Sequence, residues 1–368
     1  MIPVFRLTAD RKDITAAIAD RLISISYKDE AETKSDRLTL RLDDRPRDGS
    51  YLAMPSVGTK LEFAIGYKDG GAVSMGSFTV DEIKYSGPVA TLEIGAKAAG
   101  METSFRSPVS KSWNDTTLGA IAEAIAKEHG FTVKADPVLA AVPVRHEDQT
   151  NESSMAFLTR LASAHDAVAK PVDGYLVLAP KGQAKAVTGK ALPGVTLRPG
   201  DLTSWTYSYS ARSEAGEADK DGADKPGSKG GTKAVYWDKD TAALNAVTVG
   251  DPPYENVKFV SSNPEKAAAD ASTKKNEKDR EKARFNGSGP GNPRMMAEQR
   301  LTLSGFRPGV PTDWRVTSVE HKLDKGGYTC SLDAEQFNEG QQNAAANAAK
   351  LAKVGADGSV PDADVVRF

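Results

Sequence analysis

The chain has 368 residues, a net charge of −2 and 39% hydrophobic residues. This length predicts two or three domains, and the near-zero charge gives no general attraction to nucleic acid or to an anionic membrane. The single cysteine, Cys330, excludes an internal disulfide framework and a cysteine-rich metal site. The sequence shows neither the apolar core of a signal peptide nor a run of about 20 apolar residues that would span a membrane. We therefore expect a soluble protein with no membrane anchor, made in a reducing cytoplasm.

The first part of the chain, residues 21–96, alternates polar and apolar side chains with a period of two. The run 37–42 alternates strictly, and the run 60–67 places its large apolar side chains on one face. Strands of this kind bury one face and expose the other to water, as they do in antiparallel sheets. Glycine-containing turn signals such as Asp48-Gly49 separate them. We predict a small antiparallel β-barrel or sandwich over residues 1–102.

An α/β insert is predicted next, over residues 103–195. Its first helix should begin near Asp115–Thr116, which are good N-cap residue types, and end at His129–Gly130. A second helix should begin between Asn151 and Ser153, and Gly174 then turns the chain into a short apolar strand. The side chains expected to face inward from the second helix are Phe157, Leu158, Leu161 and Ala162.

The segment 149–180 carries no recognisable array of catalytic residues. We expect its polar start, Gln149 to Ser154, to be an exposed helix cap that also contacts a neighbouring molecule. The whole segment is interpreted as a spacer that helps to position two β-domains in one assembly.

Strand character returns at 205–209 and 234–237, so a second β-barrel domain is predicted over residues 196–340. The segment 213–231 is polar and glycine-rich, and we expect it to be a mobile loop inside this domain. The residues 341–368 are expected to be a C-terminal tail that orders only on a partner.

A charged helix is predicted over residues 264–284, within the second β-domain. Asn263 is a good N-cap, and Pro264 suits the first helical position. The thin alanine face of this helix could rest on a sheet or on a neighbouring subunit. The glycine- and proline-rich run 286–293 should end the helix, and strands should follow at 300–303, 314–321 and 328–335.

Two hairpins repeat a pattern. The segments 78–83 and 314–319 both read aromatic-x-Val-x-x-aliphatic, and the segments 91–96 and 329–334 both read Thr-x-x-aliphatic-x-Ala. Many amphipathic hairpins share such a pattern, but it also indicates two similar β-domains, one on each side of the insert. A ring of such chains holds twice as many domains as subunits.

Chemistry-bearing residues form no recognisable catalytic, cofactor-binding or metal-binding site. The four histidines show no ligand spacing, and neither a nucleophile elbow nor a phosphate-binding loop is present. His129 should cap a helix C-terminus, His165 should be a surface or half-buried residue, and His321 should pair with the neighbouring Glu320. Cys330 should be a packing residue in a strand. We predict a protein that is not an enzyme and has no cofactor.

Several segments together resemble the late control protein D family, the tail hub proteins of contractile phages, which in turn resemble the N-terminal part of type VI secretion spike proteins. Asp36 leads directly into a strand, and Trp113-Asn-Asp-Thr-Thr-Leu118 opens the first helix. The segments 149–154 and 173–176 follow, and Trp314-Arg-Val-Thr-Ser-Val-Glu-His321 precedes a glycine hairpin. The resemblance lies in the order and spacing of these segments over about residues 1–340.

The resemblance implies a mainly β chain with two tail-tube-like antiparallel β-barrel domains and an α/β insert between them. It implies a homotrimer in the virion tail baseplate that joins the hexameric tail tube to the trimeric central spike and lines a channel. Further implied partners are the tape measure protein and the baseplate wedge proteins, with DNA only as passing cargo.

Three other interpretations stay open. The same architecture would serve as the hub of a phage-tail-like bacteriocin or of a secretion-type particle. Some tail hubs carry cell-wall hydrolase domains, although no paired carboxylates stand out here. A glycan-binding protein could use Trp205, Tyr207 and Tyr209, which share one face of a strand, but such a stripe more often faces a core.

Overall fold

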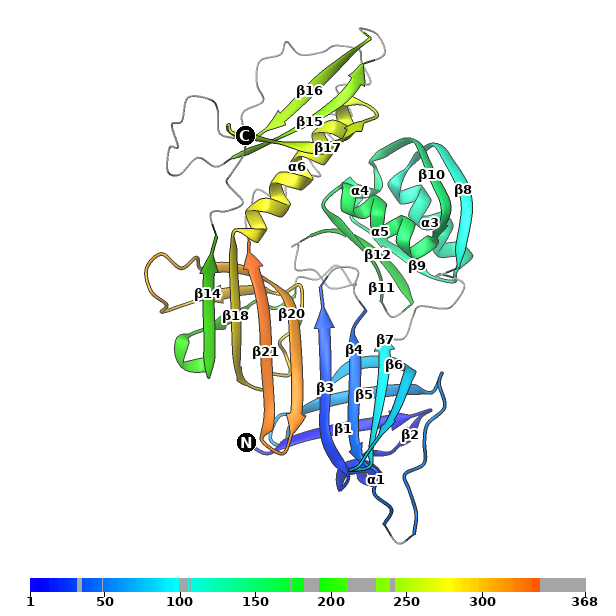
Figure 1. Cartoon of the computed structure of the whole chain (residues 1–368), viewed down its shortest axis with the longest axis vertical. Helices are drawn as coiled ribbons and strands as arrows, with labels where there is room; N and C mark the ends of the chain where they lie inside the picture. The colour runs from blue at the N-terminus through cyan, green and yellow to red at the C-terminus, as the bar shows by residue number, and fades with distance from the viewer. Residues whose placement is uncertain are drawn as a thin grey trace. The chain divides into compact units, whose positions relative to one another are not determined.

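The structure is a computed structural model (Figure 1), and it describes residues 1–31, 35–47, 49–98, 105, 107–172, 174–181, 192–210, 230–238 and 242–337. The chain forms two compact units, each assembled from separate segments. Unit 1 comprises Met1–Met101, Leu192–Tyr207 and Phe285–Ala334; unit 2 comprises Glu102–Ala191, Ser208–Arg284 and Glu335–Phe368. These units do not follow the linear domain boundaries expected from the sequence. The expected tail 341–368, and all but the last two residues of the expected loop 213–231, lie outside the described residues.

Unit 1 is built on one thirteen-stranded sheet. Its strands are β1 (Pro3–Ala9), β2 (Lys12–Asp13), β3 (Leu22–Glu30), β4 (Arg37–Asp43), β5 (Lys60–Tyr67), β6 (Gly71–Ser86), β7 (Thr91–Ala98), β13 (Val195–Leu197), β14 (Ser204–Tyr209), β18 (Ala283–Pro290), β19 (Arg300–Leu303), β20 (Asp313–Asp324) and β21 (Gly327–Gln336). A short helix α1 (Thr15–Ala19) and a 3-10 turn η1 (Pro199–Asp201) complete the unit. We call β1–β7 the first half of unit 1, and β13, β14 and β18–β21 the second half.

The two halves of unit 1 have the same strand order. In the first half, apart from the two-residue β2, the order is β1-β5-β6-β7-β4-β3; in the second it is β13-β19-β20-β21-β18-β14. Numbered along the chain within each half, both orders read 1-4-5-6-3-2. The first strands differ in direction, because β1 is antiparallel to β5 whereas β13 is parallel to β19. The repeated hairpins are β6–β7 and β20–β21, so the prediction of two similar β-domains is confirmed at the level of strand order.

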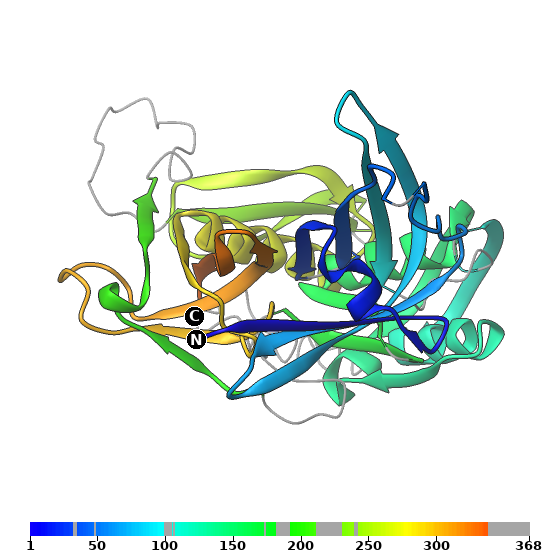
Figure 2. The ribbon, with the colours of Figure 1, turned by 90° about the horizontal axis from the view of Figure 1, so that it is seen from below.

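The halves are joined edge to edge within the sheet. The C-terminal part of β20 pairs antiparallel with β3, from Ser318 opposite Glu30 to Asp324 opposite Ser24. Figure 1 shows β3, β4, β20 and β21 side by side, and Figures 1 and 2 show β1 crossing their direction where the first half curls into a barrel. The core of the first half contains Leu7, Ile25, Leu38, Phe63, Phe78 and Leu92, together with Leu323 and Tyr328 of the second half.

The second half is discontinuous in sequence, because the chain leaves it after β14 and returns at β18. Residues 234–237 were expected to continue this barrel; that prediction is wrong, because they pair only with strands of the excursion. Period-two alternation identifies a strand but not the sheet that it joins. The run 286–293, expected only to end a helix, lies largely in β18. Its glycines allow close approach: a Cβ on Gly289 would lie 2.8 Å from the Asp201 carbonyl oxygen.

Unit 2 contains the α/β insert and the excursion. The insert has β8 (Pro108–Thr117), α3 (Leu118–Glu128), β9 (Thr132–Ala135), α4 (Pro137–Ala140), β10 (Pro143–Ser153), α5 (Ser154–Ala164), β11 (Ala167–Val172) and β12 (Tyr175–Pro180). The excursion has β15 (Gly231–Asp238), β16 (Ala243–Val249), β17 (Tyr254–Ser261) and α6 (Pro264–Glu281). Three small sheets result, with the strand orders β10-β8, β11-β12-β9 and β16-β15-β17.

Both helices predicted in the insert are present. Helix α5 begins after Ser153, whose hydroxyl accepts the backbone N–H of Ala156, and its four predicted inward side chains are all buried. Helix α3 begins slightly later than expected, because β8 continues through Thr117, which is the N-cap. His129 is its C-cap, as predicted. None of the described helices is long and apolar enough to cross a membrane.

Helix α6 matches the predicted charged helix. The Asn263 side chain accepts the backbone N–H of Lys266, and Pro264 occupies the first turn. The alanine face was expected to pack on a sheet or on a neighbouring subunit, and in the structure it packs on a sheet. Ala267 and Ala271 pack on Ala234 of β15 and on neighbouring apolar side chains of β15–β17. Because alanine side chains are short, the helix axis can approach the sheet closely.

Candidate assembly surfaces

His321 is a buried structural residue of β20. Its Nδ1 lies 2.7 Å from the Tyr328 hydroxyl, and its Nε2 lies 3.0 Å from the Met295 carbonyl oxygen. Since a carbonyl only accepts, Nε2 donates to Met295 and Nδ1 accepts from Tyr328. Burial lowers the pKa of His321 to about 4 and so keeps the ring neutral. The predicted pairing with Glu320 is wrong, because the Glu320 carboxylate accepts from the Ser26 hydroxyl at 2.7 Å instead.

The other histidines lie in unit 2. His129 approaches the Ser154 hydroxyl at 3.2 Å, and the exposed His146 contacts Asn114 and Asp148. His165, the C-cap of α5, is half-buried, and desolvation, reinforced by the Lys266 charge, lowers its pKa to about 4. These side chains serve helix ends and strand surfaces.

Cys330 is buried in β21, with its Sγ 3.9 Å from the Met295 sulfur. Burial raises the pKa of this thiol to about 12, so the reactive thiolate is scarce at neutral pH. This agrees with the predicted packing role. Within the described ranges, no group of three or more His, Cys, Asp or Glu side chains is arranged to hold a metal ion.

The segment Gln149–Ser154 is only in part the exposed cap that its polarity predicts: Ser153 caps α5 and Asn151 is exposed, but both ends of the segment are buried. Gln149 and Ser154 are only 2% and 3% exposed, and the Gln149 side-chain amide donates to the Glu152 carbonyl at 2.9 Å. Residues 149–153 are the end of β10, paired with β8, and Asn151 has a φ of +47° at the irregularity between these strands. This pairing was not predicted, because the two polar strands lie far apart in sequence.

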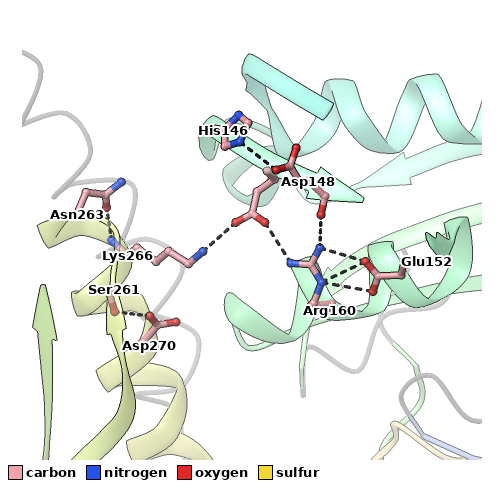
Figure 3. A network of polar contacts seen from close by, with 9 residues as sticks. His146, Asp148, Glu152, Arg160, Ser261, Asn263, Lys266 and Asp270 are labelled. Carbon is pink, nitrogen blue, oxygen red and sulfur yellow. Dashed lines mark hydrogen bonds and ion pairs between the residues drawn. The ribbon is translucent and has the colours of Figure 1, made fainter. Parts of the chain in front are cut away.

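A polar network joins α6 to the α/β insert (Figure 3). Glu147 of β10 accepts from the Lys266 ammonium at 2.8 Å and from the Arg160 guanidinium at 3.1 Å. Arg160 also binds the Glu152 carboxylate and donates to the Asp148 carbonyl at 2.9 Å. Burial would raise the pKa of Glu147, but its hydrogen bonds to these two cations hold it below its usual value.

A second, buried contact fixes the other end of α6. Arg280 donates to both carboxylate oxygens of Asp166, at 2.6 and 2.9 Å, and both side chains are 4% exposed. Asn276 donates to the same carboxylate, and Thr273 donates to the Ala164 carbonyl. Helix α6 thus uses its alanine face for its own sheet and a polar face for the insert.

Two of the open backbone edges in the sheet of unit 1 belong to β14 and to the end of β6. Among the described strands, β14 is hydrogen-bonded only to β18, and β6 pairs with β5 only as far as Thr79. Beyond Thr79, the edge of β6 that faces away from β7 carries no strand in the described part of the chain. Tyr85 of β6 is 57% exposed. Unpaired edges are templates for pairing with another chain, which makes these two segments the candidate assembly surfaces.

The aromatic stripe of β14 faces the second half without being buried by it. Trp205 packs beside Phe285 and Phe306, and Tyr207 meets Trp314 edge to face at 5.9 Å. Trp205 nevertheless remains 42% exposed. Tyr209 is 56% exposed. The stripe therefore packs beside aromatic side chains of the second half but is not the core that its pattern favoured, because β14 ends the sheet and leaves apolar surface uncovered.

Comparison with known proteins finds phage baseplate hub proteins among the relatives of this chain. The family described as Phage tail baseplate hub (GPD) matches residues 91–327. Two curated proteins, both called probable baseplate hub protein, come from Escherichia phages 186 and P2, and each is 36% identical to this chain over 201 residues. The alignments cover 55% of this chain and 51% of each relative. The chain thus spans about half the length of the curated relatives it matches.

Solved structures share the fold at low sequence identity. A 43 kDa tail protein of prophage MuSo2 from Shewanella oneidensis matches with a TM-score of 0.65 and 16% identity, covering 91% of this chain and 98% of that one. A tail protein from Neisseria meningitidis MC58 matches at 0.64 and 12%, covering 94% and 99%. A type VI secretion component of E. coli matches at 0.53 and 13%, covering 87% and 74%.

Proposed function

This chain belongs to the phage tail baseplate hub (GPD) family, and from that premise we propose that it is a homotrimer joining the hexameric tail tube to the trimeric central spike. The hub position in the tail baseplate comes from the family. The trimer, its two neighbours and a channel through it are the proposal.

The shared strand order of the two halves is the observation that carries this proposal. Each chain has two halves with the same strand order, so three chains, each half forming a barrel, would present six like barrels. A sixfold tube and a threefold spike can then meet the same molecule, because six like barrels match the tube while three chains match the spike. A single barrel per chain would offer no such match.

We further propose that this hub acts by binding and by lining a passage, not by catalysis. The buried neutral His321 and the buried Cys330 support a structural role for these side chains. The tape measure protein and the baseplate wedge proteins would be further partners, and DNA would pass through as cargo. Synthesis would take place in the cytoplasm of the bacterial host. A zymogram on peptidoglycan tests the catalytic part: a clearing band from the purified chain would contradict it.

Sedimentation of the chain co-expressed with its spike protein tests the trimer. We expect the chain alone to be monomeric or prone to aggregate, and the complex to contain three copies of this chain with three of the spike. A stable dimer of the chain alone would contradict the proposal, since a closed two-chain assembly offers four barrels and not six.

A further inference from the structure

The contact that joins the two halves within one chain can be repeated between chains. Strand β20 has two parts: its start pairs with β19, and its end pairs with β3 of the other half. Strand β6 holds the matching place in the first half. Its start pairs with β5, but along the same edge its end has no strand beside it among the described residues.

The match between β6 and β20 holds residue by residue. Val80 donates its N–H to the Thr59 carbonyl at 3.0 Å, and its own carbonyl accepts from Gly58 at 2.8 Å. Val316 makes the same pair of bonds, with Gln299 at 3.0 Å and Glu298 at 2.9 Å. The repeated sequence aligns the same two valines. With Val80 aligned to Val316, Lys84 corresponds to Glu320 and Ser86 corresponds to Lys322.

Strand β14 matches β3 in the same way. Each is the second strand of its half and lies last in the strand order. Tyr27 of β3 lies opposite Leu38 of β4. The backbone bond from Ser210 to the Lys282 carbonyl, followed back along both strands, places Tyr207 opposite Phe285 of β18. Tyr207 therefore corresponds to Tyr27, and Thr206 and Ser208 correspond to Ser26 and Lys28.

Side chains at the existing β20–β3 contact are buried, whereas the side chains at the matching positions of β6 and β14 are exposed. This difference is expected if β6 and β14 each lack a neighbouring strand in the single chain. His321 is 1% exposed beside β3, whereas the matching Tyr85 is 57% exposed. Ile25 is 0% exposed beside β20, whereas the matching Trp205 is 42% exposed. Tyr27 and His321 stack at 5.7 Å across the existing contact. Tyr207 and Tyr85 would meet in the same way across a repeated one.

We propose that the end of β6 in one copy pairs antiparallel with β14 of a second copy, in the register of β20 with β3. Lys28 lies opposite Glu320, and Ser26 opposite Lys322. Ser208 of one copy therefore lies opposite Lys84 of the next, and Thr206 opposite Ser86. The contact is head-to-tail, because each copy offers one β6 end and one β14, and in the proposed trimer three such contacts close the ring. This inference rests on the proposed hub assembly and specifies the interface within it.

Mixed single-cysteine variants test the pairing and its register. The variants are K84C, S86C, T206C and S208C; all four side chains are exposed, and the native Cys330 is buried. Each β6 variant is mixed with each β14 variant, co-assembled with the spike protein and mildly oxidised. Opposite residues in a sheet bring Cβ atoms to about 5 Å and diagonal ones to about 7 Å or more, and a disulfide needs about 4 Å.

We expect disulfide-linked dimers from K84C with S208C and from S86C with T206C, at several times the yield of the two crossed mixtures. No single variant should link to itself. Self-linking of S208C or T206C alone would overturn the proposal, since it requires two β14 strands to meet.

The experiment distinguishes a failure of the proposed trimer from a failure of the proposed interface. A complex with three copies of the chain but no linked pair overturns the β6–β14 pairing and leaves the hub trimer standing. A complex with one copy overturns both. A preference for the crossed mixtures overturns the register.

Discussion

His321 lies inside unit 1 with one ring nitrogen bonded to Tyr328 and the other to Met295. Protonation breaks the bond from Tyr328, because the imidazolium has no acceptor for the Tyr328 hydroxyl, while Nε2 can still donate to the Met295 carbonyl. The folded pKa of about 4 lies below the ordinary value near 6.5. Between these values the unfolded chain binds more protons than the folded chain, so stability falls as the pH falls.

Urea unfolding of unit 1 at pH 7.5 and pH 4.5 measures this effect. In the native chain, His321 should account for a loss of about 2–3 kcal/mol between the two pH values. The H321Q variant should be less stable at pH 7.5 but should lose that much less on acidification. An equal pH dependence for H321Q and the native chain would contradict the assignment.

Glycine is required immediately after β18, where the chain passes close to Tyr328. A Cβ on Gly291 would lie 2.2 Å from the Tyr328 ring. Substitution G291A should therefore destabilise unit 1 by about 1–3 kcal/mol, the usual cost of overpacking. G70A is the matched control, since nothing lies within 4 Å of a Cβ there; it should change stability by less than about 0.5 kcal/mol. Thermal unfolding of both variants compares them, and equal melting temperatures would contradict the close approach.

At the scale of elements, α6 shows how one helix can serve two surfaces. Its alanines pack on β15–β17, while Lys266, Thr273, Asn276 and Arg280 reach the insert. The Arg280–Asp166 pair is the buried member of this set. A buried pair contributes little net stability over an apolar pair, but the loss of one partner leaves an uncompensated charge.

The R280M variant should lower the stability of unit 2 by about 3–5 kcal/mol, because it leaves the Asp166 carboxylate buried without its cation. The double variant with D166L should recover a large part of that loss. K274A breaks an exposed pair with Glu277 and should cost less than about 1 kcal/mol. Denaturant unfolding of the three variants gives these differences. A single R280M effect as small as that of K274A would show that the pair is not buried in solution.

Sequence patterns predict individual elements well where one face of the element is buried by its own neighbours. Strand β4 and helix α5 follow their expected periodicity, and the repeated hairpins occupy equivalent places. Patterns fail where distant segments decide the outcome. Gln149 is polar yet buried, because β8 covers it, and Trp237 belongs to a sheet that alternation cannot identify. From the sequence alone, the polar face of α6 is predicted to face solvent. In the structure, Arg280 on this face is buried against Asp166, which lies 114 residues earlier in the chain.

At the scale of the whole molecule, assembly depends on backbone edges that a monomer leaves open. The paired variants T206K and S208K place two lysines on β14, and lysines on an edge strand discourage pairing. The double variant should fold with a native melting temperature but should fail to form the trimer with the spike. The matched control is A246K with T248K, on the exposed strand β16 of unit 2. Sedimentation of both complexes distinguishes them, and an intact trimer with the β14 variant would contradict the role of this edge.

The excursion between β14 and β18 begins and ends at neighbouring points. The Ser210 N–H donates to the Lys282 carbonyl at 2.9 Å, so the outgoing and returning chains lie side by side. A segment inserted in this way imposes no length on the barrel from which it leaves, because its two ends already meet. Changes in the length of the excursion should therefore leave the sheet of unit 1 intact. Such changes could adapt a hub to a new neighbour without altering the strands that form its proposed ring.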